Sequence, residues 1–197
     1  MGRRIVTALG FIVLVLLVGE DTIARDVERC EVPITFTSYD VSGDTFEELY
    51  AALRQRGPKD DTGNARYAYT RWKVAWRWKS MGDGTIDANS VDLACSASVH
   101  LPRLVNRDHH APALLAQWDA FVERTRKHEL NHIEHVRRGA PRITQMIQER
   151  AGDKGILSSK QAKAIARTVV ADLHAMDRAY DMRTNHGKTE GTWAITG

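Results

Sequence analysis

The ten residues Arg126–His135, RKHELNHIEH, stand in the middle of a long helical pattern. From Pro112 onward the apolar residues follow the 3.6-residue period of an α-helix, and Gly139–Pro141 marks its expected end. These apolar residues are Leu114, Leu115, Trp118, Phe121, Val122 and Leu130. We therefore expect a helix from Pro112 to about Arg138 that contains the ten residues, followed by a second helix over Arg142–Arg150.

His128 and His132 are four positions apart, so a helix places both imidazoles on one face, where they can bind one metal ion. Glu129 lies about 100° around the helix from His128, and its carboxylate can reach a water on that ion. Zinc lowers the pKa of such a water, and the glutamate accepts its proton as a carbonyl is attacked. The alternative is a solvated helix face that is rich in histidine.

A third ligand has to come from elsewhere in the chain. His135 is excluded, because seven helical residues separate it from His128 by roughly 10.5 Å and zinc binds its ligands at about 2 Å. A capping box at Ser158–Gln161 opens a last helix, on which Asp177 and Asp181 share a face. Either aspartate could complete the site while the other orients a histidine, and His186 is a third candidate. The residues expected to face inward from this helix are Ile165, Val169, Val170, Leu173, Met176 and Tyr180.

The residues before the long helix have the two-residue period of strands. Val32–Val41 is rich in β-branched and aromatic residues, while Trp72–Trp78 and Val91–Leu101 alternate apolar with polar or small side chains. Asp44, with a glutamate three residues later, predicts the start of a short helix that ends near Gly57. The tryptophans are expected on the buried face of a sheet; the alternative is a ligand platform.

The composition is that of a globular domain. The chain has 197 residues, 43% of them hydrophobic and 27% charged, which suits one domain with a real core. The net charge of +3 is too small to indicate a nucleic acid as partner.

The first 24 residues have the pattern of a secretory signal. Arg3 and Arg4 precede an apolar run over Ile5–Val18, which is short for a transmembrane helix of roughly 20 residues. We therefore expect a signal peptide over residues 1–24 and a single domain over residues 25–197. The alternative is an uncleaved N-terminal anchor, which would be the chain's only contact with a membrane.

The chain contains two cysteines, Cys30 and Cys95. An even number of cysteines in an exported protein predicts a disulfide between them. Two buried free thiols are the alternative.

The sequence resembles the bacterial predicted secreted zinc-dependent proteases, catalogued as domain of unknown function 922. The segments that carry this resemblance are Tyr69–Trp72, Val99–Pro102, His128–His132 and Tyr180–Gly187. The resemblance implies a zincin-like fold, zinc and proteolysis, and it favours Asp181 over Asp177 as the third ligand. Glu190 departs from the family pattern, in which glutamine is expected there.

We predict an α+β, zincin-like domain with a small N-terminal sheet and its backing helix, an active-site helix and a helical C-terminal half. The expected function is that of an exported peptidase, in which Zn²⁺ held by His128, His132 and Asp181 activates a water. Glu129 would act as general base and then as acid. An extended polypeptide substrate could pair with an edge strand at Val91–Leu101.

His186 is the first candidate for stabilising the oxyanion of the reaction, and Tyr180 is the second. Two other functions stay open. One is a zinc hydrolase that acts on a non-peptide amide, such as one of the cell wall. The other is a catalytically silent zinc-binding protein of the same fold, although such a protein has no use for a base at Glu129.

Overall fold

A sheet and several long helices form the part of the chain that the computed structural model describes, residues 29–60 and 63–192. The predicted signal peptide lies outside these residues. The elements are β1 (Ile34–Val41), α1 (Phe46–Arg56), β2 (Tyr69–Gly82), β3 (Thr85–Leu104), α2 (Pro112–Gly139), α3 (Arg142–Ala151), β4 (Ile156–Ser158) and α4 (Ser159–Thr184), with short 3₁₀ turns at Arg107–His109, Gly152–Lys154 and Lys188–Glu190. The α+β class and the predicted long helices are confirmed.

The sheet is built around β3. β1 pairs with it in parallel, β2 pairs with it antiparallel, and β4 pairs with its first residues. The segment Val91–Leu101, expected as a substrate-binding edge, lies in the central strand β3. β2 pairs along it and β1 pairs with it from Ala97 onward, so Ala97–Leu101 is not an edge. Among the described residues, β1, β2 and β4 each pair only with β3, and β1 and β2 are the long edge strands.

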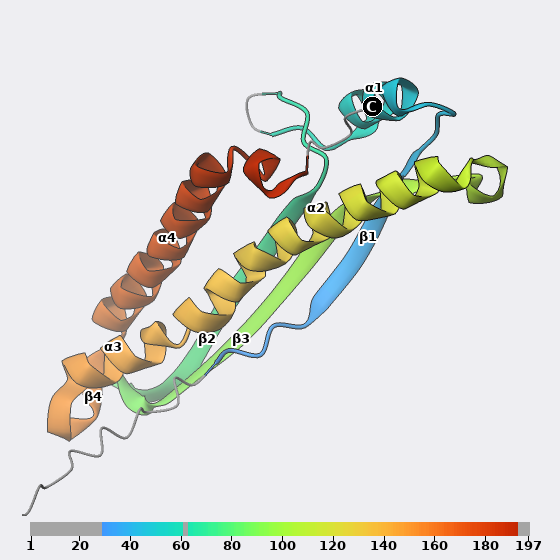
Figure 1. The fold of residues 1–197 in the computed structure, drawn as a ribbon. Helices are drawn as coiled ribbons and strands as arrows, with labels where there is room; N and C mark the ends of the chain where they lie inside the picture. The colour runs from blue at the N-terminus through green and yellow to red at the C-terminus, as the bar shows by residue number, and fades with distance from the viewer. Residues whose placement is uncertain (1–28, 61–62, 193–197) are drawn as a thin grey trace, which may run out of the picture.

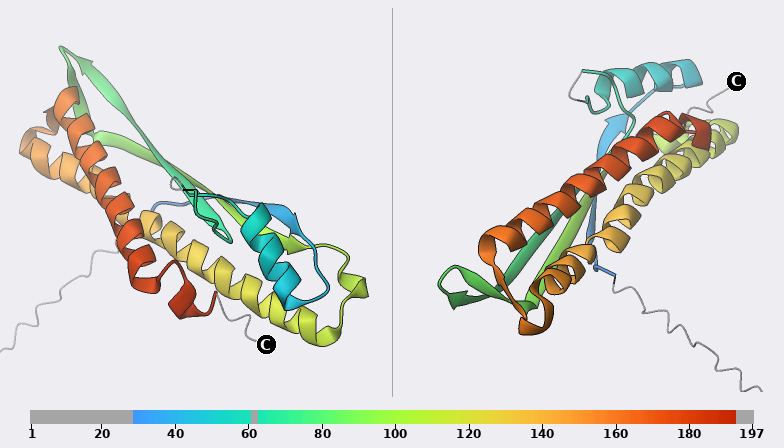
Figure 2. Two further views of the ribbon diagram at one scale, coloured as in Figure 1. Left: turned by 90° about the horizontal axis from the view of Figure 1, so that it is seen from above. Right: turned by 90° about the vertical axis from the view of Figure 1, so that its left-hand side faces the viewer.

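Helices α2, α3 and α4 lie on one face of this sheet, and the views in Figures 1 and 2 show no helix over the opposite face of the described part. Trp72, Trp76 and Trp78 pack against the apolar core between sheet and helices, so the tryptophan stripe belongs to the core, as expected. Gly139 allows α4 to approach the end of α2 closely, because a Cβ there would lie 2.4 Å from a methyl group of Leu173.

The apolar interior consists of two clusters, and α2 contributes to both. Its first half packs with α1 and the ends of β1 and β3, through Leu114, Trp118 and Phe121. Its last half, with Ile133 and Val136, packs with the sheet, α3 and α4. The buried residues of α2 between these clusters are polar, so the two apolar clusters enclose a polar segment of the helix.

Helix α1 begins one residue later than predicted. Thr45 is its N-cap and accepts a hydrogen bond from the backbone N–H of Glu48, whose carboxylate accepts from the backbone of Asp44. Thr45 therefore caps the helix in place of Asp44, because its hydroxyl reaches the third N–H of the helix, while Glu48 binds the N–H one residue before the cap.

The predicted disulfide between Cys30 and Cys95 is present and joins the segment before β1 to the middle of β3. In the described residues no helix is long and apolar enough to cross a membrane.

Candidate metal centre

The histidine motif lies on the buried side of α2. The buried residues of this helix recur every three or four positions and include His128, Glu129 and His132, whose exposed fractions are 5%, 6% and 7%. The alternative interpretation, a solvated face rich in histidine, is therefore wrong. Burying three such groups is costly unless each has a polar partner.

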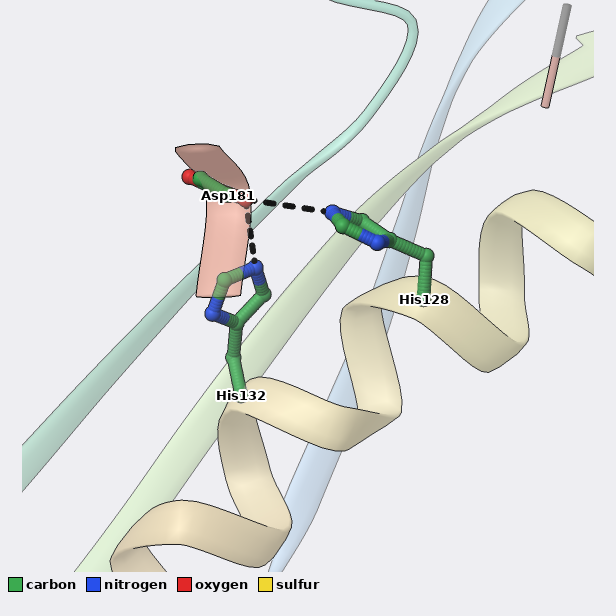
Figure 3. A group of neighbouring side chains, drawn as sticks. All are labelled: His128, His132 and Asp181. Carbon is green, nitrogen blue, oxygen red and sulfur yellow. Dashed lines mark hydrogen bonds and ion pairs between the residues drawn. The ribbon is translucent and has the colours of Figure 1, made fainter. Parts of the chain in front are cut away.

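Asp181 of α4 supplies the partner that the two histidines share. Its Oδ1 atom lies 3.2 Å from Nε2 of His128 and 3.2 Å from Nε2 of His132, as Figure 3 shows. Two ligand atoms bound tetrahedrally to one zinc ion at about 2.0–2.1 Å are about 3.3 Å apart. The spacing and the chemistry of these three side chains therefore fit a zinc ion.

Glu190 binds the other nitrogen of His128. Its Oε2 atom lies 2.8 Å from Nδ1 of His128, and both of its carboxylate oxygens accept a hydrogen bond from the hydroxyl of Tyr180 at 2.9 Å. A carboxylate in this position fixes the ring with Nε2 directed at the shared Asp181 oxygen.

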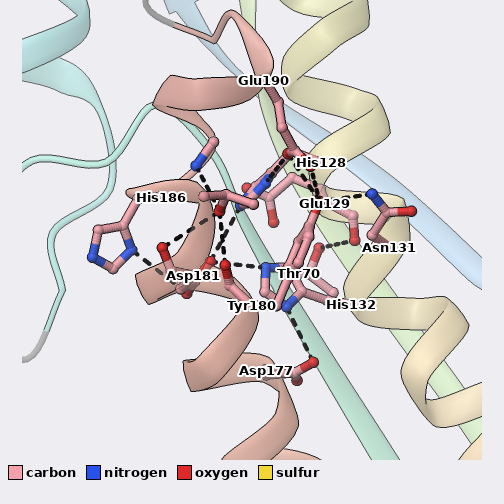
Figure 4. Close-up of polar contacts among 12 residues, drawn as sticks. Thr70, His128, Glu129, Asn131, His132, Asp177, Tyr180, Asp181, His186 and Glu190 are labelled. Atoms are coloured by element: carbon pink, nitrogen blue, oxygen red, sulfur yellow. Dashed lines mark hydrogen bonds and ion pairs between the residues drawn. The ribbon is translucent and has the colours of Figure 1, made fainter.

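Asp177 binds the other nitrogen of His132 in the same way. Its Oδ1 atom lies 3.1 Å from Nδ1 of His132 and 2.8 Å from Nδ1 of His135, and its Oδ2 atom accepts a bond from Trp72 at 2.6 Å. Figure 4 shows the contact between Asp177 and His132. Asp177, His132 and His135 form a second group with metal-binding spacing. We assign Asp177 to orientation, because it holds three hydrogen-bond donors in place.

The carboxylates on both sides change the charge of the two histidines in the metal-free protein. Burial opposes protonation, but hydrogen bonds to Asp177 and Asp181 outweigh it and raise the pKa of His132 to about 10. The pKa of His128 is raised by the corresponding bonds to Asp181 and Glu190, also against burial. Burial would raise the pKa of Asp181, yet the two imidazoles hold it far below its ordinary value. A bound metal would take the place of the Nε2 protons.

Tyr180 supports His128 from the side. The two rings stack with centroids 4.9 Å apart and an interplanar angle of 19°. The tyrosine hydroxyl is enclosed, because it accepts a bond from Nδ2 of Asn131 at 2.6 Å while it donates to Glu190. This hydroxyl is therefore committed to the support of the histidine.

Glu129 and His186 border a cavity of about 260 Å³ above the three candidate ligands. Burial raises the pKa of Glu129 above its ordinary value, so its carboxylate is a stronger base than that of an exposed glutamate. His186 follows α4 and is exposed, with 39% of its side chain accessible, and its Nδ1 lies 3.6 Å from Oδ2 of Asp181. Burial lowers its pKa and the nearby Arg66 lowers it further, so the neutral imidazole is favoured.

The segment after α4 folds back onto α2 and carries Glu190. Gly187, at φ +81°, permits this turn, because a Cβ there would meet Thr192 at 2.7 Å and the ring of His128 at 3.2 Å. The Nε of Arg124 on α2 donates to the carbonyl of Gly191 at 2.7 Å and fastens the segment. The hydroxyl of Thr192 is buried beside the metal cavity without a hydrogen-bond partner among the described residues.

The structure thus brings every predicted site residue to one place, His128, Glu129, His132, Tyr180, Asp181 and His186, together with Asp177. Sequence reasoning missed the contacts of Glu190, Asn131 and Trp72. Trp72 and Glu190 lie outside the helix that carries the histidine motif, so no helical period links them to it. The one signal for Glu190 in the sequence was its departure from the glutamine that the family pattern has at this position.

A family model described as "Bacterial protein of unknown function (DUF922)" matches residues 36–187. The match contains all the candidate ligands and ends before Glu190. No curated protein and no solved structure matches the chain.

Proposed function

The chain belongs to the DUF922 family of bacterial proteins, whose model spans residues 36–187, and we propose that it is an exported zinc-dependent peptidase with a zincin-like fold. The strongest support is the convergence of His128, His132 and Asp181 on one point, with Glu129 beside the same cavity. The disulfide between Cys30 and Cys95 supports a destination outside the reducing cytoplasm.

In this proposal His128 and His132 bind zinc through Nε2, and Asp181 binds it through its carboxylate. Glu190 and Asp177 hold the two imidazoles in the orientation that directs Nε2 at the metal. When bound, zinc would polarise a substrate carbonyl and lower the pKa of a water in its open coordination position.

Glu129 accepts the proton of the attacking water and then donates it to the leaving amine. Its side chain is suited to both steps, because burial raises its pKa above the ordinary value of a glutamate while the carboxylate still borders the cavity.

His186 is the group that we assign to the oxyanion. It borders the cavity, and its neutral imidazole can donate a hydrogen bond. For Tyr180 we propose the positioning of His128, since its hydroxyl is already bonded to Asn131 and Glu190.

Strand β2 offers a place for an extended polypeptide. Among the described residues it pairs only with β3, and its first residues, Tyr69 and Thr70, line the cavity together with Tyr67 and Ala68. An extended substrate could add to this open edge and place a peptide bond at the metal.

A peptide-library digest with the zinc-loaded protein tests the proposal, with cleavage sites determined by mass spectrometry and Glu129→Gln as the matched inactive control. Cleavage by the wild-type protein alone is expected. A wild-type protein that holds zinc and cleaves no peptide would overturn it. Release of product from a cell-wall amide would then indicate a non-peptide hydrolase, and no turnover at all would indicate a silent zinc-binding protein.

A further inference from the structure

A second cavity adjoins the metal cavity on the side of α1. Its volume is about 430 Å³, and it shares Arg66, Tyr67 and His186 with the metal cavity. The other residues around it are Tyr50, Arg54, Asn64, Ala65 and Lys188. The two cavities are therefore neighbours that share part of their walls.

The second cavity is basic. Arg54, Arg66 and Lys188 line it, and no carboxylate is among the described residues that do. The acidic side chains gather in the metal cavity instead, where Asp60, Glu129, Asp177 and Asp181 lie. The two neighbouring cavities thus differ in charge, with carboxylates around the candidate metal ligands and cationic side chains beyond His186.

Arg66 is fixed at the boundary of the two cavities. One of its nitrogens donates to Asp60 at 2.6 Å, and its backbone N–H donates to the carbonyl of Pro58 at 2.8 Å. This bond to Asp60 is the only side-chain hydrogen bond of Arg66 within the described residues. A guanidinium group has five N–H donors, so others remain to bind an anion from the cavity.

We propose that this basic cavity, formed by Arg54, Arg66 and Lys188 beside His186, binds a carboxylate group of the substrate. The carboxylate comes from an acidic side chain or from the free C-terminus of a peptide. Paired guanidinium donors match the geometry of a carboxylate, and an anchored arginine loses little freedom on binding. The inference rests on the proposed peptidase function, whose substrate class it specifies.

Matched peptides test the proposal through the ratio of their kcat/KM values. In the first set of pairs, the two peptides differ only by glutamate or glutamine at one position, and each position that flanks the cleaved bond is varied in turn. In a second pair, one peptide ends in a free acid and the other in an amide. We expect the wild-type protein to prefer the carboxylate in one pair by about 10- to 100-fold, as a charged hydrogen bond provides. The pair that shows the preference identifies the source of the carboxylate.

Two variants and a control locate the effect. Arg54→Gln and Arg66→Gln should each lower the carboxylate preference several-fold, and Arg54 is exposed on α1, so its replacement leaves the core intact. Arg56→Gln is the control, because Arg56 lies on the same helix and contacts Asp40 instead of the cavity. Equal rates for both members of every pair, or a preference that Arg54→Gln and Arg66→Gln leave unchanged, would overturn the proposal.

Binding to the Glu129→Gln protein separates this inference from the peptidase function. Fluorescence anisotropy of labelled peptides should show tighter binding of the carboxylate member, and Arg54→Gln in the same background should weaken it. If no peptide is cleaved and this selective binding persists, the carboxylate site stands without the peptidase. If peptides are cleaved and binding shows no preference, the peptidase stands without the carboxylate site.

Discussion

Replacement of Glu190 by alanine should weaken zinc binding without removing a ligand. The carboxylate accepts from Nδ1 of His128 at 2.8 Å and from the hydroxyl of Tyr180, so the variant frees both the ring and the tyrosine. Loss of a group that orients a metal-binding histidine typically costs 10- to 100-fold in metal affinity. This corresponds to about 1.4–2.8 kcal/mol of binding free energy.

The environment sets where in that range each variant should lie. The side chain of Glu190 is 34% exposed, so water can partly replace it, and we expect a loss near the lower end. Asp177→Ala should cost more, because that side chain is 16% exposed and also holds His135 and Trp72. Glu190→Gln keeps an oxygen that can accept from Nδ1, and its effect should stay below about tenfold.

The assay is the zinc dissociation constant, measured by competition with a chromophoric chelator at fixed pH. Glu123→Ala is the control, since Glu123 lies on α2 but pairs with Arg126 at the surface. A folded Glu190→Ala protein whose dissociation constant stays within twofold of wild type would refute the assigned orientation of His128.

The remaining predictions concern catalysis, the third ligand, the disulfide and pH. Glu129→Gln should retain zinc and lose nearly all turnover, because an amide does not accept the proton of the water; near-normal peptide cleavage would contradict the proposed mechanism. Asp181→Ala should lose zinc on dialysis, while His186→Ala should keep it and turn over about 10²- to 10³-fold more slowly; the reverse distribution of zinc would exchange their roles. Replacing both Cys30 and Cys95 by serine should lower the unfolding free energy by about 4 kcal/mol in urea titrations, because the disulfide joins residues that are 65 positions apart. An unchanged urea midpoint would argue against this estimate. In the metal-free protein the folded-state pKa of His132 is raised to about 10, so its protonation stabilises the fold fully below about pH 6.5, and this contribution is lost as the pH rises toward 10. The melting temperature of the metal-free protein should therefore fall between these two pH values. A melting temperature that stays flat over this window, or that falls equally in a His132→Gln variant, would exclude this contribution.

The long helices and strands of the fold could be predicted from the sequence. The helices α2 and α4 show many turns of one apolar stripe, and their predicted bounds were correct within one or two residues. Each strand of the β2–β3 hairpin shows several alternations, so both strands were located, but β2 and β3 extend beyond the predicted segments at both ends. Their lengths make the periodic signal strong. β4 was missed because three residues cannot display a period.

Pairing and orientation could not be predicted in the same way. The alternation in β3 shows that one face is buried but does not show which strands lie beside it, and the strand expected at the edge is the central strand of the sheet. Met176 was expected to face inward, yet it is 46% exposed, because the neighbouring Asp177 turns toward His132 and Trp72. Polar contacts to the site displaced an apolar residue from the buried side of α4.

The candidate ligands were visible in the sequence because a helix converts spacing into direction. His128 and His132 needed only the helix that contains them, and Asp181 was favoured by the family resemblance. Glu190 needed a chain reversal after α4, which depends on positive φ angles at Asn185, His186 and Gly187. Asparagine and glycine permit such angles without requiring them, so the turn could not be derived.

The two halves of the metal centre are far apart along the chain. Asp181 is 53 residues from His128 and Glu190 is 62 residues from it, so a nascent chain that has formed only α2 possesses two histidines and no site. In the proposed peptidase, metal uptake would therefore be a late event in biogenesis, coupled to the docking of α4. Until then, the buried segment of α2 is a polar gap between two apolar clusters, and the ion that fills it would also join the last helix to the rest of the molecule.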